Sequence, residues 1–255
     1  GSVNEFIKTN IDGTRCILEQ IVEHKNRGVD INLIQVSTDE VYGSLKPEEA
    51  PFVEETPLRP MNPYAATKAS ADMLVQSFVN THGICAAITR CSNNYGPNQF
   101  PEKLIPLMIL NSLEGKSLPV YGDGKQIRDW IHVSDHVSGI IATLKAVEEN
   151  KVDSPFVINF GADNEMTNLE IVETVIEIIG VGREMIQFVS DRPGHDRRYA
   201  MGYGKAWELL SWEPQVMWRE GITNTVEWYL SNPEWIESIR SDEYRTWLEN
   251  HYGRD

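Results

Sequence analysis

The chain has 255 residues, of which 41% are hydrophobic, so it is long enough to bury a substantial core in one large domain or two smaller ones. Its 38 acidic residues outnumber its 23 basic residues, and the formal net charge of −15 repels nucleic acid and anionic membrane surfaces. We therefore expect neither as a partner, and we expect any phosphate-bearing ligand to be met by a few local cations.

The three cysteines are scattered along the chain. Cys16, Cys85 and Cys91 form no CxxC pair and their number is odd, which argues against a disulfide framework and against a zinc site. No apolar segment approaches the roughly 18 residues that span a bilayer, and the first residues do not resemble a signal peptide. We expect a cytoplasmic protein without a bound metal.

Helix and strand patterns alternate in the first part of the chain. Apolar side chains recur at helical spacing over residues 5–26, which predicts a helix. An apolar run at 31–36, bounded by polar residues, predicts a buried parallel strand. A second run of this kind, at 84–89, lies beyond a proline-rich loop and a further helical stretch.

The helix between these two strands has recognisable ends. Asn62 suits the N-cap position, Pro63 suits the first turn, and Gly83 closes the helix after residues 64–82. A strand, a crossover helix and a second strand form a βαβ unit, so we expect a parallel sheet with helices on its faces.

Beyond residue 97 the predicted elements are shorter. The set comprises helices at 104–113, 133–147 and 167–180 and strands at 118–121 and 156–160. Thr167 and Glu170 have the spacing of a capping box at the start of the last helix.

Tyr64 and Lys68 lie four residues apart on the predicted helix, so they share a face. A neighbouring ammonium favours the phenolate and lowers the pKa of a tyrosine, which makes such a pair a candidate base. A bare YxxxK is common by chance, and the plain alternative is a surface lysine one turn after a half-buried tyrosine.

Three polar side chains, Thr38, Asp39 and Glu40, directly follow the first predicted strand. In open α/β sheets, ligands lie outside the carboxyl ends of the strands, and the helix that begins near Tyr64 opens on the same edge. We therefore expect the carboxylates and the tyrosine to converge on one site. A solvated turn or a helix N-cap is the alternative.

Six motifs in fixed order carry a family resemblance: STDEVYG, YAATKASAD, RCSNNYGPNQFPEKLIP, YGDGKQIRDWIHVSDH, DRPGHDRRYA and EGITNTVEWYL. Over residues 5–252 the chain closely resembles the dTDP-glucose 4,6-dehydratases, which belong to the extended short-chain dehydrogenase/reductases. Related sugar-nucleotide epimerases commonly have small hydroxyl residues at the positions of Asp39 and Glu40, and this difference favours dehydration over epimerisation.

The resemblance implies an NAD-dependent dehydration that makes a 4-keto-6-deoxy sugar. Tyr64, assisted by Lys68, takes the C4 hydroxyl proton while hydride passes to NAD+, and Thr38 bonds the C4 oxygen. Glu40 then removes the C5 proton and Asp39 protonates the departing C6 hydroxyl, after which hydride returns to C6 and C5 is reprotonated. Adjacent, coupled acids can supply one ionised and one protonated carboxyl for this step.

The resemblance also implies binding residues for both ligands. Ser37, Tyr64, Lys68 and Cys91 are expected at the cofactor. The residues expected at the nucleotide and diphosphate of the substrate are Asn93, Lys103, Arg128, Asn168, Arg192 and His195. Two of these have simpler alternatives, because Asn168 can cap the helix at 167–180 and Arg128 can pair with Asp129.

The fold implied is α/β: an incomplete, Rossmann-like, doubly wound parallel sheet and a smaller C-terminal α+β substrate-binding domain. Residues 1–97 are expected to form the catalytic part of the NAD-binding domain. Residues 98–255 are expected to bind mainly the sugar nucleotide, with about 125–165 returning to the Rossmann core. A homodimer is also implied, in which the helices at 5–26 and 64–82 pack across a two-fold axis.

The sequence lacks the GxxGxxG turn that holds the pyrophosphate of NAD in this family. Three interpretations follow: a partial sequence of an ordinary dehydratase, a non-catalytic sugar-nucleotide-binding relative, or one half of a split enzyme. Another nucleotide-sugar dehydratase or epimerase of the same family is a further alternative.

Overall fold

The computed structural model describes residues 2–191 and 196–239. The chain forms two compact units. The first comprises Gly1–Asn94, Ile127–Glu165 and Pro193–Gln215, and the second comprises Tyr95–Gln126, Met166–Arg192 and Val216–Asp255. The return of 193–215 to the first unit is a feature that the sequence patterns did not predict. The assignment of a cofactor role and a substrate role to separate domains stays a prediction.

The first unit is built around a parallel sheet. Its helices are α1 (Val3–Phe6), η1 (Ile7–Asp12, a π-helical turn), α2 (Gly13–Asn26), η2 (Asp39–Tyr42, a 3-10 helix), α3 (Pro63–His82), α5 (Val133–Glu148) and α7 (Gly204–Leu210). Its strands are β1 (Asn32–Val36), β2 (Cys85–Cys91), β5 (Ile127–His132) and β6 (Phe156–Phe160). The chain passes from this unit to the second unit within β3 (Asn93–Tyr95). It returns at the start of β5 and passes to the second unit again within β7 (Glu165–Thr167).

Strand β2 lies in the middle of the sheet, between β1 and β6, and pairs parallel with both. In this register Val36, the last residue of β1, lies beside Thr89, and the last residues of β2 and β6, Cys91 and Phe160, lie beside each other. All three strands therefore end at the same edge of the sheet, where β1 leads directly into η2.

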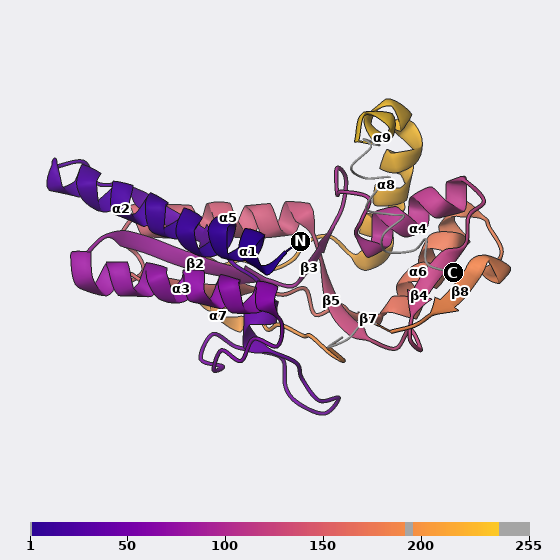
Figure 1. Ribbon diagram of the computed structural model, residues 1–255, viewed down its shortest axis with the longest axis horizontal. Helices are drawn as coiled ribbons and strands as arrows, with labels where there is room; N and C mark the ends of the chain where they lie inside the picture. Colours follow the sequence, from indigo (N-terminus) through magenta and orange to yellow (C-terminus); the bar gives the residue numbers. More distant parts are fainter. Residues whose placement is uncertain (1, 192–195, 240–255) are drawn as a thin grey trace. The chain divides into compact units, whose positions relative to one another are not determined.

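Helices cover both faces of this sheet. On one face Ala86 and Ile88 of β2 pack in a core with Leu18 of α2 and Val75 of α3, and α2 and α3 run side by side (Figure 1). On the other face Ala87 packs in a core with residues of α5, β6 and α7. This is the doubly wound, Rossmann-like α/β arrangement that the βαβ pattern predicted.

The predicted ends of α3 are confirmed. The Asn62 side chain accepts a hydrogen bond from the backbone N–H of Ala65, Pro63 lies in the first turn, and Gly83 ends the helix in the left-handed conformation. The predicted helix at 5–26 is also confirmed, with one difference: residues 7–12 wind as a π-helix.

A buried polar network lies beneath the end of β1. Arg90 of β2 forms an ion pair with Asp72 of α3, with Nε 3.0 Å from Oδ2, and donates a hydrogen bond to the hydroxyl of Tyr42 in η2. Ser37 donates to the same Asp72 oxygen, and Tyr42 donates to Asn159 of β6. The network therefore ties η2 to α3 and to two strands of the sheet.

The second unit is mainly helical. It contains α4 (Leu104–Leu113), β4 (Leu118–Tyr121), α6 (Asn168–Ile179), the 3-10 helix η3 (Arg183–Met185), β8 (Ile186–Val189), α8 (Trp218–Ser231) and α9 (Pro233–Ile239). Strands β4 and β8 pair parallel, and α4 contacts both α6 and α8. The capping box predicted for α6 is confirmed, because Thr167 accepts from Glu170 N–H and Glu170 accepts from Thr167 N–H.

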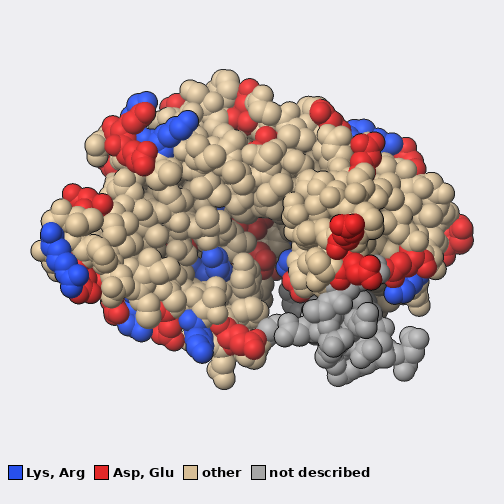
Figure 2. All heavy atoms as spheres, turned by 90° about the horizontal axis from the view of Figure 1, so that it is seen from above, with Lys and Arg blue, Asp and Glu red and all other residues tan. Residues whose placement is uncertain are grey.

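On the face shown in Figure 2, charged side chains are scattered among other residues, and the Lys and Arg side chains do not gather into a basic patch. Cys16, Cys85 and Cys91 are free thiols, of which Cys16 is exposed and Cys91 is buried. Within residues 2–191 and 196–239, no helix combines the length and the apolar character needed to cross a bilayer.

Gly43, which follows η2, has a conformation that other residues rarely adopt, with φ 92° and ψ −154°. A β-carbon at this position would lie 2.6 Å from the carbonyl oxygen of Arg59, whereas one at Gly28, which also has positive φ, meets no atom within 4 Å. We expect Gly43→Ala to lower the free energy of unfolding by about 2–4 kcal/mol, and Gly28→Ala by about 1 kcal/mol. Urea denaturation measures both, and equal losses would contradict the predicted clash.

Candidate active site

Thr38, Asp39 and Glu40 lie where β1 gives way to η2. Thr38 is extended and caps η2, because its Oγ1 accepts a hydrogen bond from the backbone N–H of Glu40 at 3.3 Å. The same hydroxyl lies 3.2 Å from Asp39 Oδ1, to which it donates. The first turn of a helix favours negative charge, so the local fold supports two adjacent carboxyl groups here.

Asp39 and Glu40 have different surroundings. Asp39 is 4% exposed, and its Oδ2 has no hydrogen-bond partner among the described residues, whereas Glu40 is half-buried. Burial, together with the charge of Glu40, raises the pKa of Asp39 from 3.8 to about 7. Burial therefore favours the protonated form of Asp39, so this carboxyl can act as an acid.

Tyr64 lies in the first turn of α3, with its ring packed edge-on against Phe6 at a centroid distance of 5.5 Å. Burial, followed by the charges of Glu40, Cys91 and Asp39 in that order of importance, raises the pKa of Tyr64 to about 12. The phenol therefore shares one electrostatic environment with both carboxyl groups, and this is the convergence that the strand and helix patterns predicted.

Lys68 is half-buried one turn after Tyr64, and its Nζ donates a hydrogen bond to the carbonyl oxygen of Val36 at 2.7 Å. Burial lowers the pKa of Lys68. The expected lowering of the tyrosine pKa by this ammonium is wrong, because burial and the charges of Glu40, Cys91 and Asp39 all raise that pKa. Lys68 instead links α3 to the end of β1.

Asn62 connects the carboxylates to the helix. Its Nδ2 donates to Glu40 Oε2 at 2.9 Å, while its Oδ1 accepts from Ala65 N–H at 2.8 Å. The sequence predicted only the second of these contacts.

Arg128 of β5 is buried beside the same carboxylates. Its guanidinium stacks over the ring of Tyr199 at 4.4 Å and donates to the carbonyl oxygens of Ile127 and Asp196. Burial lowers the pKa of Arg128, and the charges of Tyr199, Asp39 and other groups oppose that shift. The alternative of an Arg128–Asp129 ion pair is wrong, because the Asp129 carboxylate accepts the backbone N–H groups of residues 162 and 164 instead.

Comparison with known proteins gives a consistent result. A family model described as GDP-mannose 4,6 dehydratase matches residues 2–225. Over 267 residues the chain is 44% identical to dTDP-glucose 4,6-dehydratase 1 of Escherichia coli (strain K12), a match that covers 97% of this chain and 73% of the relative. The chain belongs to the dTDP-glucose 4,6-dehydratase family. The resemblance inferred from the sequence motifs is thereby confirmed.

Solved structures of dTDP-glucose 4,6-dehydratases share the fold of this dehydratase-family chain. That of the enzyme from Bacillus anthracis str. Ames in complex with NAD has a TM-score of 0.85 and 45% identity, and covers 94% of this chain and 73% of that chain. The structure of the enzyme from Streptomyces venezuelae with NAD bound has a TM-score of 0.87 and 39% identity. The match covers 94% of this chain and 71% of the Streptomyces chain.

Some of the residues predicted to bind substrate lie in the second unit or outside the described residues. Lys103 is exposed and pairs with Glu102 at 3.3 Å, and Asn168 is the first residue of α6, where Thr167 is the N-cap. The cap alternative for Asn168 is therefore wrong. Arg192 and His195 lie outside the described residues. In the first unit, Asn93 Oδ1 is buried without a partner among the described residues.

One of the residues predicted to hold NAD, Lys68, has hydrogen-bond donors left for a ligand. Lys68 Nζ has three donors and uses one on Val36, which leaves donors for the hydroxyls of a ribose. Ser37 is buried with its hydroxyl on Asp72, and Cys91 is buried with its sulfur accepting from Asn94, so these two have internal partners. Their contact with a cofactor stays a prediction.

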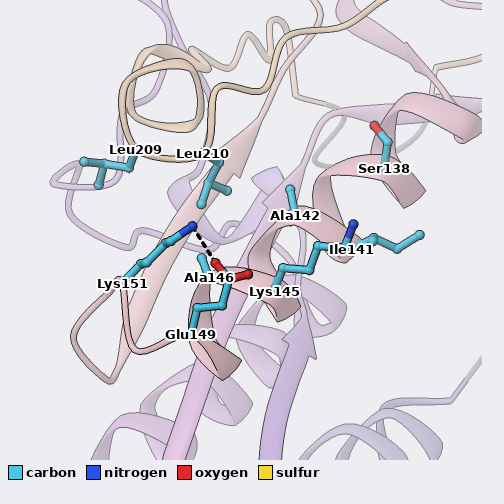
Figure 3. Close-up of a pocket in the computed structure, with 9 residues that line it drawn as sticks. All are labelled: Ser138, Ile141, Ala142, Lys145, Ala146, Glu149, Lys151, Leu209 and Leu210. Atoms are coloured by element: carbon cyan, nitrogen blue, oxygen red, sulfur yellow. Dashed lines mark ion pairs between the residues drawn. The ribbon is translucent and has the colours of Figure 1, made fainter.

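Two surface hollows of the first unit are lined by other residues. One, of about 500 Å3, is lined by side chains of α5 and α7 and by the Glu149–Lys151 ion pair (Figure 3). No predicted site residue lines it. Among the described residues, no group of three His, Cys, Asp or Glu side chains is arranged to hold a metal.

The sequence analysis missed two members of this site. Tyr199 lies in the DRPGHDRRYA motif, which carried the family resemblance, but only the fold brings it under Arg128. The second is the amide of Asn62, because a cap position is recognisable in sequence and a contact 22 residues away is not.

Replacing Asp39 by Asn tests the effect of its burial. The folded-state pKa lies above the ordinary 3.8, so the folded chain binds this proton more tightly than the unfolded chain does. The free energy of unfolding of the wild type therefore falls as pH rises from 3.8 to about 7. We expect Asp39→Asn to gain stability relative to wild type across that range, up to about 4 kcal/mol above pH 7. Urea denaturation at a series of pH values measures the difference, and a constant difference would contradict the assignment.

Proposed function

We propose that this chain catalyses the NAD-dependent dehydration of dTDP-glucose to a 4-keto-6-deoxy sugar nucleotide. One observation supports the reaction type above all others: two adjacent carboxyl groups in different environments lie at the end of β1 and share their surroundings with Tyr64. The curated and solved relatives named dTDP-glucose 4,6-dehydratase support the choice of substrate.

Elimination of water across C5 and C6 of a hexose needs an acidic C5 proton, and a ketone at C4 provides one. Tyr64 accepts the proton of the C4 hydroxyl, and Thr38 bonds the C4 oxygen. Glu40 removes the C5 proton. Asp39, which is buried with its pKa raised to about 7, gives its proton to the departing C6 hydroxyl.

The different burial of Asp39 and Glu40 supports this division of roles. An acid must hold a proton that a base beside it lacks, and desolvation keeps the proton on the more deeply buried carboxyl. Asp39 is the buried member and Glu40 the half-buried one. Because neighbouring acids titrate as a pair, the two roles are properties of the pair.

NAD+, when bound, would take a hydride from C4 and give it back to C6 while C5 regains a proton. Tyr64 and Lys68 would hold its nicotinamide end, with Ser37 and Cys91 next to that end. Arg128 and Asn93 meet the diphosphate and nucleotide of the substrate from the first unit, and four further residues complete this binding set: Lys103, Asn168, Arg192 and His195. Arg suits a diphosphate because its planar fork offers paired N–H donors.

Turnover of dTDP-glucose with excess NAD+, followed by mass spectrometry of the 4-keto-6-deoxy product, tests the proposal directly. Calorimetry with each ligand provides the control. Product formation is the expected outcome. Binding of both ligands without conversion would contradict it and would favour a non-catalytic sugar-nucleotide-binding protein.

Glu40→Gln separates the first step from the second. The variant keeps the shape of the side chain and loses the base, so we expect reduced nicotinamide to accumulate while product formation falls by at least about 100-fold. Stopped-flow absorbance of the nicotinamide and isotope exchange at C5 measure the two steps. Normal product formation by this variant would contradict the role of Glu40.

We further propose a cytoplasmic homodimer. The three unpaired cysteines support a reducing compartment. The helices α2 and α3, which contact each other, each expose a large apolar side chain, Ile17 and Met73, and these support a helical interface between two copies.

The dimer proposal predicts that Ile17→Lys and Met73→Lys shift the chain toward monomer, because each places a charge in the interface. Val137→Lys on α5, a position with similar exposure, is the matched control and should leave the mass unchanged. Light scattering over a range of concentrations measures the mass, and a monomeric wild type would contradict the proposal.

A further inference from the structure

We propose that Asn62 is a positioning residue for Glu40, and that its side-chain amide fixes the base of the elimination step relative to the helix that carries Tyr64. This inference rests on the proposed function, because it concerns how the assumed base is held. Asn62 touches neither the cofactor nor the sugar in this proposal and acts through Glu40.

The two contacts of Asn62 fix the orientation of its amide. Ala65 N–H is a donor, so the atom 2.8 Å from it must be the acceptor Oδ1. The other end of the amide is then the NH2 group, 2.9 Å from Glu40 Oε2. An exchange of the two amide atoms would place two donors together at Ala65 and two oxygens together at Glu40, so only one orientation satisfies both contacts.

The amide holds one oxygen of Glu40 and leaves the other for chemistry. Oε1 accepts no hydrogen bond within residues 2–191 and 196–239, while Oε2 accepts from Asn62. A carboxylate with one oxygen restrained has a defined direction for the other, which is what proton removal from carbon requires. The side chain of Glu40 is thus restrained at its far end, whereas its backbone is fixed by η2.

The same side chain determines where α3 begins. Tyr64 lies two residues after Asn62, and Lys68 lies one turn further, so both follow from the capped start of the helix. One residue therefore sets the spacing between the group that deprotonates O4 and the group that deprotonates C5.

Capping alone does not require an asparagine. Serine and aspartate cap helices about as well as asparagine, yet neither carries an NH2 group that can reach Glu40 while it caps. The two functions of Asn62 can therefore be separated by substitution. Asn62→Ser keeps the cap and removes the amide donor, and Asn62→Asp keeps the cap and places a second carboxylate against Glu40.

We expect both variants to melt close to the wild type and to keep the rate of C4 oxidation within about twofold. We expect the elimination step to slow by about 10- to 100-fold in Asn62→Ser, which is the rate equivalent of one hydrogen bond to a charged group. Asn62→Asp should be slower still, because like charges repel. Stopped-flow nicotinamide absorbance and C5 isotope exchange measure the two steps, with KM expected to change little.

A double-mutant cycle tests whether Asn62 acts through Glu40. In the Glu40→Gln background, Asn62→Ser should slow C5 exchange by less than about twofold more, because the base is already absent. A second readout needs no turnover: the side-chain amide resonance of Asn62, assigned by its loss in Asn62→Ser, should move in Glu40→Gln.

The outcomes distinguish this inference from the function on which it rests. Elimination unchanged in both Asn62 variants, or an amide resonance unmoved by Glu40→Gln, would overturn the positioning role. Oxidation, elimination and melting temperature falling together would also overturn it and would leave Asn62 as a helix cap alone. Normal product formation by Glu40→Gln is a failure of the proposed function itself and is seen before any Asn62 variant is made.

Discussion

The site depends on one buried ion pair, that between Arg90 and Asp72. Two charges removed from water stabilise a fold only when every remaining donor and acceptor nearby is used, and removing one partner of such a pair typically costs about 3–5 kcal/mol. Here Ser37 donates to Asp72 Oδ2 and Tyr42 accepts from Arg90, while Asp72 Oδ1 is the one oxygen of this carboxylate that has no partner among the described residues. Ser37 and Tyr42 flank the Thr38–Glu40 segment in the sequence, so this polar cluster holds both ends of the segment that carries the proposed acid and base.

Burial explains most of the electrostatics around this cluster. Desolvation is the largest influence on the pKa of Asp39, Tyr64 and Lys68, and in each case it favours the neutral form. A chain with a net charge of −15 thus places its reactive groups where charge is unfavourable. Of these groups only Asp39 has a pKa near neutrality, so it can give up a proton near neutral pH, whereas Tyr64 has to lose its own proton before it can act as a base.

Much of the fold could be read from local patterns. The cap of α3 at Asn62, its end at Gly83 and the capping box of α6 were predicted because each depends on residues within one turn of each other. The convergence of Asp39, Glu40 and Tyr64 followed from a general property of parallel sheets. The raised pKa of Tyr64 could not be predicted, because the spacing of Lys68 shows a neighbour and not the burial of either group. Long-range contacts such as Asn62 to Glu40 likewise have no signature in the sequence.

The π-helical turn at Ile7–Asp12 has a consequence for the geometry of the first helix. A π-helical turn is wider and contains one more residue than a regular α-helical turn. The side chains after it therefore point in a different direction around the helix axis, relative to the side chains before it, than they would in a regular α-helix. Phe6 can therefore face the ring of Tyr64, and Asn10 can reach Thr67, while Leu18 still packs into the sheet core. The extra residue changes the orientation of one segment relative to the next, and the two segments have different neighbours: the first contacts α3, which carries Tyr64, and the second contacts the sheet core.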